Sequence, residues 1–258
     1  MEWTVFPLIL VAGFIAGIIN TIAGSGSLIT LPLLIFLGLP AGVANGTNRV
    51  GILLQNLVGS ASYQRSGVLD GRGALWLSGS AIVGAIIGAQ IAVDLDEELL
   101  RRSIGVVMVL MLGVVLLRPE RWLNGAFEMM DGPPTWQAHL SMFFIGIYGG
   151  FIQAGVGAFL LGVLVLVVGY DLVRANAVKV LVVMIFTVFA LGVFVRNGQV
   201  DWGVGLVLAS GNMLGAWVAA RLAVEKGAPW VRKILIVTIA IASLYMLGIF
   251  DWLAMLLN

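Results

Sequence analysis

GFIAGIINTIAGSGSLITLPLLIFLGLPAGVANGTNR, residues 13–49, is strongly apolar, but glycine and polar residues interrupt it where an ordinary membrane span carries Leu or Val. Asn20 and Thr21 lead into Gly24-Ser25-Gly26-Ser27. As a single helix, residues 5–38 would be about 50 Å long, whereas the hydrocarbon core of a bilayer is about 30 Å thick. The glycine-rich tetrapeptide therefore predicts a break between two apolar arms.

The composition around this stretch is that of an integral membrane protein. Of the 258 residues, 60% are hydrophobic and only 10% are charged, too few charges to cover a soluble domain of this size. We therefore expect a multi-pass protein of the cell membrane, with the lipid bilayer as a partner. The net charge of +1 indicates no nucleic-acid partner. The chain has no cysteine, which excludes disulfides and thiolate metal sites.

Apolar segments come in two sets of five, separated by a polar interval. The first set lies at about 5–23, 27–38, 44–64, 74–93 and 102–117, and the second at about 139–154, 157–169, 175–195, 203–223 and 231–250. We expect a first transmembrane repeat in residues 1–118, an amphipathic linker in 119–138 and a second repeat in 139–258.

The two sets match at a constant offset of 131 residues, which is the signature of an internal repeat. Asn20 and Gln153 match at an offset of 133, which implies a two-residue deletion. The matches are not confined to glycine, which is common throughout this chain, but include Asn, Asp and a basic pair. The pairs at the offset of 131 residues include Gly24/Gly155, Gly26/Gly157, Gly38/Gly169, Asn45/Asn176, Gly67/Gly198, Asp70/Asp201, Gly84-Ala85/Gly215-Ala216 and Arg101-Arg102/Arg232-Lys233. After their turn signals, Asp70 and Asp201 are expected to be helix N-caps.

The relative orientation of the repeats follows from the break and from the charges. If the broken segment makes a hairpin or two crossings, each repeat crosses the membrane an odd number of times and the halves are inverted. Inversion also places ten of the fourteen basic residues on the cytoplasmic side, against nine for a parallel arrangement, a slight preference under the positive-inside rule. We thus predict an all-α polytopic membrane protein of two tandem repeats, inverted rather than parallel. Each repeat has one broken or re-entrant helix pair and three spanning helices.

The broken segments are the predicted binding site. The second arm of a broken helix points its N-terminal amides and the positive end of its dipole at the break, which favours an anion. Two broken segments would do so from opposite sides. The alternative is that these glycines only allow close helix packing.

Two cations reinforce the anion interpretation. Arg49 and Lys179 occupy nearly equivalent places in apolar segments that contain no carboxylate, and an intramembrane cation is a candidate functional residue. The alternative is that both side chains reach the membrane interface. The predicted substrate-binding residues are Asn20, Thr21, Gly24, Ser25, Gly26, Ser27, Asn45, Asn48, Arg49, Gln153, Gly155, Gly157, Asn176 and Lys179.

Nothing in the sequence indicates catalysis. The one histidine, His139, has no acid or nucleophile beside it, and neither an H-E-x-x-H nor a Walker A motif occurs. We expect a protein that is not an enzyme, without catalytic residues, cofactor or metal site.

The runs at residues 13–27, 45–48 and 84–89 resemble the sulfite exporter TauE/SafE family, also known as 4-toluene sulfonate uptake permeases, over nearly the whole chain. The resemblance implies a permease of the cytoplasmic membrane, with seven or eight spans, for small anions such as sulfite, sulfoacetate or other sulfonates. A negative-inside potential makes export or uniport of such an anion the favoured direction. The alternative is a membrane interaction or assembly protein that transports nothing. The oligomeric state stays open, a homodimer included.

Overall fold

The computed structural model describes residues 5–106 and 135–246, and within them every regular element is a helix, which confirms the all-α prediction. The predicted segment after residue 106, the linker up to residue 134 and residues 247–250 lie outside the described residues. Residues 97–106 are also helical. The labelled helices are α1 (Phe6–Ala23), α2 (Ser27–Phe36), α3 (Ala41–Arg65), α4 (Gly71–Asp94), α6 (Trp136–Phe151), α7 (Val156–Leu166), α8 (Leu172–Arg196) and α9 (Trp202–Met246), which is broken at Gly227.

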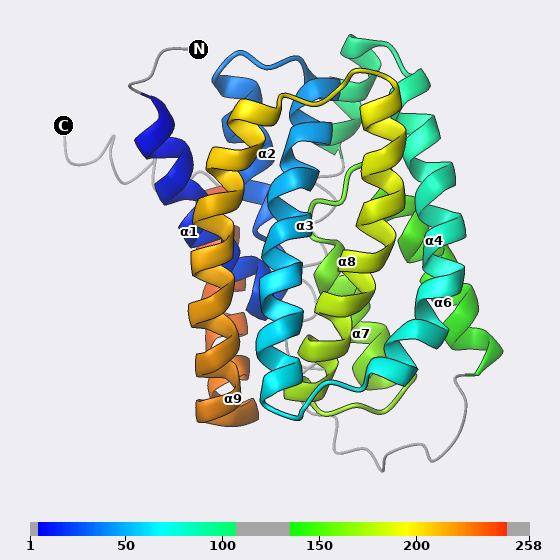
Figure 1. Cartoon of the computed structure of the whole chain (residues 1–258), viewed down its shortest axis with the longest axis vertical. Coiled ribbons are helices and arrows are strands. Elements are labelled where there is room, and N and C mark those ends of the chain that lie inside the picture. The colour runs from blue at the N-terminus through cyan, green and yellow to red at the C-terminus, as the bar shows by residue number, and fades with distance from the viewer. Residues whose placement is uncertain (1–4, 107–134, 247–258) are drawn as a thin grey trace.

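Both predicted breaks are present, and each joins two helices as a hairpin. Gly24 ends α1 with a φ of 72°, and Gly155 precedes α7 with a φ of 76°, a conformation that glycine adopts without strain. In Figure 1, α1 descends from the top and α2 returns to it, whereas α6 rises from the bottom and α7 returns there. The ten residues of α2 and the eleven of α7 span about 15–17 Å, too little to cross a bilayer.

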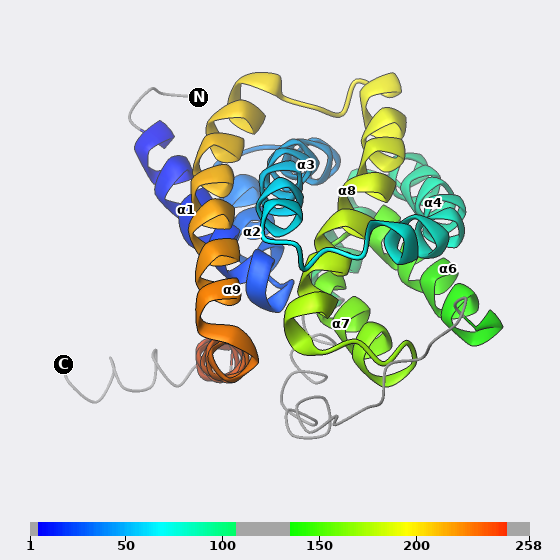
Figure 2. The same ribbon diagram turned by 60° about the horizontal axis from the view of Figure 1, so that its bottom comes forward.

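The long helices of the two halves run in opposite directions. In Figure 1, α3 and the part of α9 before Gly227 run from top to bottom, and α4 and α8 run from bottom to top. Helix α3 packs against α8 in the centre, and each half also contributes a helix to the other, since α9 packs on α1 and α4 on α6 (Figure 2). The inverted repeat stays a prediction, and these directions agree with it.

Glycines four residues apart allow close packing of α1 against α9 and of α4 against α6. A Cβ on Gly17 of α1 would lie 2.4 Å from the carbonyl oxygen of Asn212 in α9, and one on Gly84 of α4 would lie 2.1 Å from that of Phe143 in α6. Such approach is the usual role of small residues four apart in membrane helices. The packing interpretation therefore holds for Gly13/Gly17, Gly84/Gly88, Gly146/Gly150 and Gly211/Gly215.

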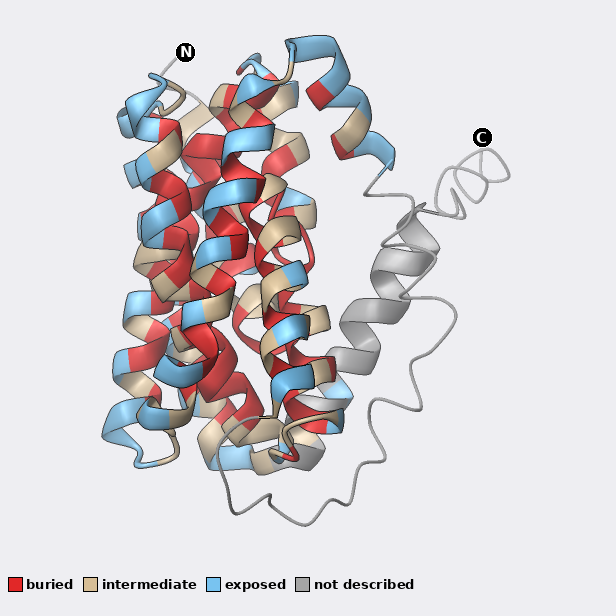
Figure 3. Cartoon of the chain, turned by 90° about the vertical axis from the view of Figure 1, so that its right-hand side faces the viewer, coloured by how far each residue is buried: buried red, intermediate tan, exposed pale blue. Residues whose placement is uncertain are grey.

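The buried residues face inward (Figure 3), and many large side chains on the outer surface are apolar. Large side chains such as Leu75 and Phe144 are about 60% exposed, as expected where lipid replaces water. Among the described residues, four helices are long and apolar enough to cross a membrane: Phe6–Ala23, Gly71–Asp94, Leu172–Arg196 and Trp202–Gly227. The chain is a multi-pass protein of the cell membrane.

The two ends of the bundle differ in charge. At the bottom in Figure 1, α3 ends at Arg65 and α4 begins beside Arg72, and both side chains are exposed. We call this the basic end. At the top, exposed Asp94, Asp96 and Glu98 surround the link from α4 to the next helix. We call this the acidic end.

A hydrogen bond joins two loops at the basic end. The Tyr170 hydroxyl, between α7 and α8, donates to Asp70 Oδ2 at 2.6 Å, while Asp70 Oδ1 accepts from the Gly73 amide. Asp70 is thus the predicted N-cap of α4, and Asp201 likewise accepts from the Val204 amide at the start of α9. Burial alone would raise the pKa of Asp70, but the hydrogen bonds from Tyr170 and Gly73 outweigh it and the pKa lies below its ordinary value.

Replacing Tyr170 by phenylalanine is expected to lower the free energy of unfolding at neutral pH by about 1 kcal/mol, because the bond to the Asp70 carboxylate is lost. A carboxyl with a depressed pKa stabilises the fold above its unfolded pKa, and this stabilisation disappears as pH falls through the folded pKa. The difference between wild type and variant should therefore narrow at acidic pH. Thermal unfolding in detergent at both pH values measures it; a difference that grows with acidity would contradict the assignment.

Candidate binding site

The tips of the two hairpins touch in the interior. The Gly157 amide donates to the Gly24 carbonyl oxygen at 3.2 Å. A Cβ on Gly24 would lie 2.2 Å from Gly157 Cα, and one on Gly157 would lie 2.3 Å from Gly24 Cα. The contact is between backbones, so only glycine fits at either position. It also uses the Gly157 amide, which is therefore not free for a ligand.

Arg49 of α3 caps the end of α6. Its side chain is fully buried. Nη1 donates to the Gly149 carbonyl and to Gln153 Oε1, both at 2.9 Å, and Nη2 donates to the Gly150 carbonyl. The guanidinium also lies 4.6 Å from the centre of the Phe194 ring. These carbonyls form the negative end of the α6 dipole, so the charge of Arg49 is directed at the broken helix.

Lys179 of α8 plays the corresponding part at the end of α1. Its Nζ donates to the carbonyls of Thr21 at 2.9 Å and Asn20 at 3.2 Å, and to Asn176 Oδ1 at 2.8 Å. Each half of the chain thus supplies the cation that caps the broken helix of the other half. Among the described residues, the salt bridge found joins Arg102 to Glu98 on the surface, and neither buried cation has a carboxylate partner.

Gln153 links Arg49 to the second hairpin. Its φ of 66° lies in the left-handed region, which is unusual for a residue with a side chain. Its Oε1 accepts from Arg49, and its Nε2 donates to Thr187 Oγ1 at 2.7 Å. Two side-chain bonds therefore hold a strained backbone in place at the break, as is common at functional sites.

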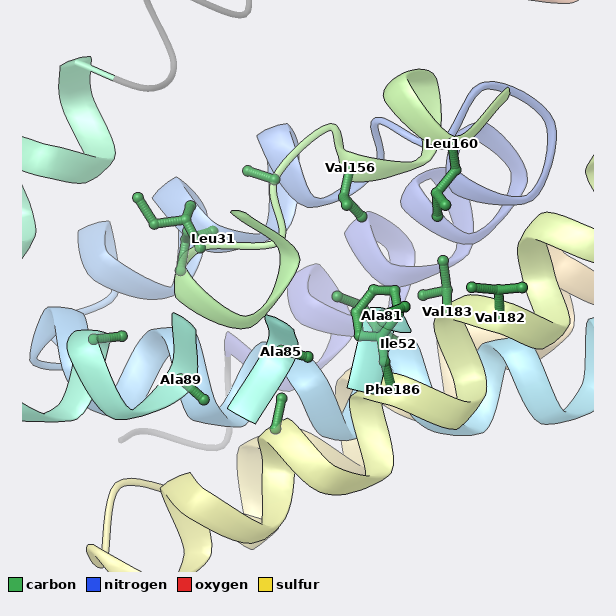
Figure 4. Close-up of a cluster of buried hydrophobic side chains, with 14 of the residues drawn as sticks. Leu31, Ile52, Ala81, Ala85, Ala89, Val156, Leu160, Val182, Val183 and Phe186 are labelled. Carbon is green, nitrogen blue, oxygen red and sulfur yellow. The ribbon is translucent and has the colours of Figure 1, made fainter. Parts of the chain in front are cut away.

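A small cavity lies beside the touching tips. It has about 10 Å³ of space for the centre of a water molecule, room for about one water, so the site is closed in this conformation. Two pairs in its wall, Asn20/Gln153 and Ile52/Val183, are partners in the repeat. Ile52 and Val183 belong to a cluster of buried apolar side chains that spans both halves (Figure 4). The wall consists of Asn20, Gly24, Ser27, Ile52, Asn56, Gln153, Val156, Gly157, Lys179 and Val183.

The structure brings some of the predicted residues to this wall and places the rest behind it. Asn20, Gly24, Ser27, Gln153, Gly157 and Lys179 line the cavity. Three asparagines lie behind the wall. Asn45 donates a hydrogen bond to the Phe151 carbonyl. Asn48 accepts one from the Thr30 hydroxyl, and Asn176 accepts one from Lys179. Thr21 and Arg49 take part in the caps of α1 and α6. Gly155, with its positive φ, is the N-cap residue of α7. The carbonyls of Ser25 and Gly26 accept hydrogen bonds in the first turn of α2, and neither residue lines the cavity.

Sequence reasoning missed Asn56. Its side chain lines the cavity, and its Nδ2 has no hydrogen-bond partner among the described residues. Spacing could have found it, because Asn45, Ile52 and Asn56 lie on one face of a helix. In residues 5–106 and 135–246, no group of His, Asp and Glu is placed to hold a metal ion.

Comparison with known proteins gives a consistent picture. The profile of the family described as "Sulfite exporter TauE/SafE" matches residues 9–246. A "probable membrane transporter protein ORF9" of Sinorhizobium is 32% identical over 248 residues, covering 94% of this chain and 92% of that protein. The "probable membrane transporter protein YfcA" of Escherichia coli K12 is 27% identical, covering 93% and 91%. One from Haemophilus influenzae is 26% identical, covering 87% and 88%. No solved structure shows a significant match.

Proposed function

The chain belongs to the sulfite exporter TauE/SafE family and is a membrane transporter; we propose that it moves a small sulfur-containing anion, such as sulfite, sulfoacetate or another sulfonate, through the cavity between its two hairpins. The family name and the chemistry of the cavity wall both support an anion. The relatives' names stop at membrane transport.

The observation that carries the proposal is the charge of this wall. Lys179 lies on it with no carboxylate partner among the described residues, beside the side-chain amides of Asn20, Asn56 and Gln153. An uncompensated ammonium group in a low-dielectric interior attracts a negative ligand, and amide N–H groups replace the water around it. Arg49 has a different part: both cations cap a broken helix, but the guanidinium of Arg49 lies off the wall.

The hairpins supply a way to open the closed site. One enters from the acidic end and the other from the basic end, and their backbones touch at Gly24 and Gly157. Displacing either hairpin would open the cavity towards one end while the other stays closed. Two inverted repeats around a central site, as predicted for residues 1–118 and 139–258, would have the usual design of an alternating-access transporter.

The membrane potential favours export. A negative-inside potential contributes about 2.3 kcal/mol per charge per 100 mV to the exit of an anion. Export therefore needs no coupling ion, and among the described residues no carboxylate lines the cavity to carry a proton inward. Flux that requires a proton or sodium gradient and persists against an opposing potential would contradict this direction.

Replacing Lys179 by glutamine is expected to lower anion flux in proteoliposomes by about tenfold or more, because a charged hydrogen bond contributes about 1.5–3 kcal/mol. Glutamine keeps a donor for the α1 carbonyls, so the protein should stay folded. Lys179→Arg should retain part of the flux, and Lys226→Gln on the exposed surface serves as the matched control. The assay compares sulfite, sulfoacetate, sulfate and simple carboxylates. A folded wild type that moves none of them would favour the assembly-protein alternative.

A further inference from the structure

A row of buried polar groups continues along α3 from the cavity towards the basic end. Asn56, Ser60 and Tyr63 are spaced four and three residues apart, which places them on one face of the helix. All three side chains are buried. Asn56 Nδ2, Ser60 Oγ and the Tyr63 hydroxyl have no hydrogen-bond partner among the described residues. A buried polar group without a partner destabilises the fold, because it has lost its hydrogen bonds to water. A row of three such groups therefore calls for a functional reason.

The row ends at a tyrosine that fills the space between the two halves. Tyr63 is fully buried, and it packs in a cluster with Ile22 at the end of α1, Ala177 and Val180 of α8, and Ala219 of α9. It lies two residues before Arg65, the last residue of α3. The Tyr63 ring, with Val68 and Leu69 of the following loop packed against its cluster, therefore lies between the polar row and the basic end.

The equivalent positions on α8 have no such row. At the offset of 131 residues, Asn56, Ser60 and Tyr63 correspond to Thr187, Leu191 and Phe194. The hydroxyl of Thr187 accepts a hydrogen bond from Gln153. The side chains of Leu191 and Phe194 have no polar groups, and the Phe194 ring stacks against the guanidinium of Arg49. Towards the acidic end, the core is thus closed by apolar side chains and by Arg49, whose Nη1 and Nη2 are bonded to the end of α6. The two directions out of the cavity differ.

We propose that the α3 row is the route by which the anion passes between the central cavity and the basic end, with the Tyr63 ring as its closing residue. The amide of Asn56 and the hydroxyls of Ser60 and Tyr63 are donors of the kind that replace water around an anion. Exposed Arg65 and Arg72 at the basic end attract the same charge. The route deepens the proposed function and rests on it for the identity of the solute.

Cysteine labelling tests the route without a transport substrate. The chain has no cysteine, so Ser60→Cys gives a single thiol, and sulfonatoethyl methanethiosulfonate is a small anionic reagent that does not cross the membrane. We expect slow labelling of Ser60→Cys alone. With Tyr63→Ala added, labelling should become at least about tenfold faster. Removing the ring leaves a cavity in the route and lowers the barrier to entry of the reagent by about 1.4 kcal/mol or more. The reagent should act only from the side that labels Ser66→Cys in the loop after α3.

Leu191→Cys in the same Tyr63→Ala background is the matched control, since it is the repeat partner of Ser60. Its labelling should stay slow from both sides. Equal labelling of Ser60→Cys with and without Tyr63→Ala, or faster labelling from the opposite side, would overturn the route. Fast labelling in a protein that moves no anion, and that sulfite does not protect, would uphold a water-filled route and refute the proposed function.

Tyr63→Phe separates the hydroxyl from the ring, and it keeps the packing if Tyr63→Ala does not fold. With the ring in place, labelling of Ser60→Cys should remain slow. Anion flux should fall by up to about tenfold, the equivalent of one hydrogen bond of about 1 kcal/mol. Unchanged flux would show that the hydroxyl does not contact the anion and would overturn its place in the route.

Discussion

Replacing Arg49 by glutamine is expected to lower the free energy of unfolding by about 3–5 kcal/mol, the cost of breaking a buried charged network. The guanidinium satisfies the carbonyls of Gly149 and Gly150 and the side chain of Gln153. The shorter amide cannot replace these bonds, and backbone carbonyls without a partner are costly inside a membrane. Thermal unfolding in detergent, together with the monodisperse fraction on gel filtration, measures the loss.

The matched variants separate a cap from a substrate ligand. Arg49→Lys keeps the charge but not the forked geometry, so it should be intermediate in stability. Arg65→Gln, on the surface at the end of the same helix, should stay within about 0.5 kcal/mol of wild type. If Arg49→Gln is as stable as Arg65→Gln but moves no anion, then Arg49 binds the substrate and is not chiefly a cap.

Gly24→Ala is expected to cost about 2–4 kcal/mol and to reduce transport to background. The methyl group would lie 2.2 Å from Gly157 Cα, which belongs to backbone that cannot rotate away. The penalty combines overpacking with a left-handed conformation on a residue that has a Cβ. The hairpin tips would separate and the bond between them would be lost.

Gly38→Ala is the control for that substitution. Gly38 also has a positive φ, of 94°, but nothing lies within 4 Å of the position that a methyl group would occupy there. It should therefore show the conformational penalty alone, about 1 kcal/mol, with flux preserved. Equal losses in the two variants would mean that the contact between the tips contributes nothing to stability or transport.

The sequence predicted those features that depend on local chemistry. Composition indicated a membrane protein. Gly24 and Gly155 indicated the two breaks, because a backbone position with a positive φ favours glycine. Asp70 and Asp201 were predicted as N-caps, and both bonds are present. The internal repeat could be found from residue matches at a constant offset, without knowing how the two halves pack.

Long-range geometry was beyond the sequence. Arg49 and Lys179 were predicted as a symmetric pair of ligands, yet Lys179 lies on the cavity and Arg49 does not. The difference depends on which carbonyls each side chain meets, about 100 residues away for Arg49. Asn56 was missed because α3 is a polar interior helix, where a further amide gives no signal against its surroundings.

The exchange of caps between the halves has a consequence for biosynthesis. Thr21 leaves the ribosome 158 residues before Lys179, an interval of about 8–30 s at about 5–20 residues per second. During that time the carbonyls at the end of α1 have no lysine to bond, whereas Arg49 has already been made when the α6 hairpin inserts. The nascent second half therefore meets a finished partner. The first half depends on the insertion machinery, or on its position at the bilayer surface, until its cap is translated.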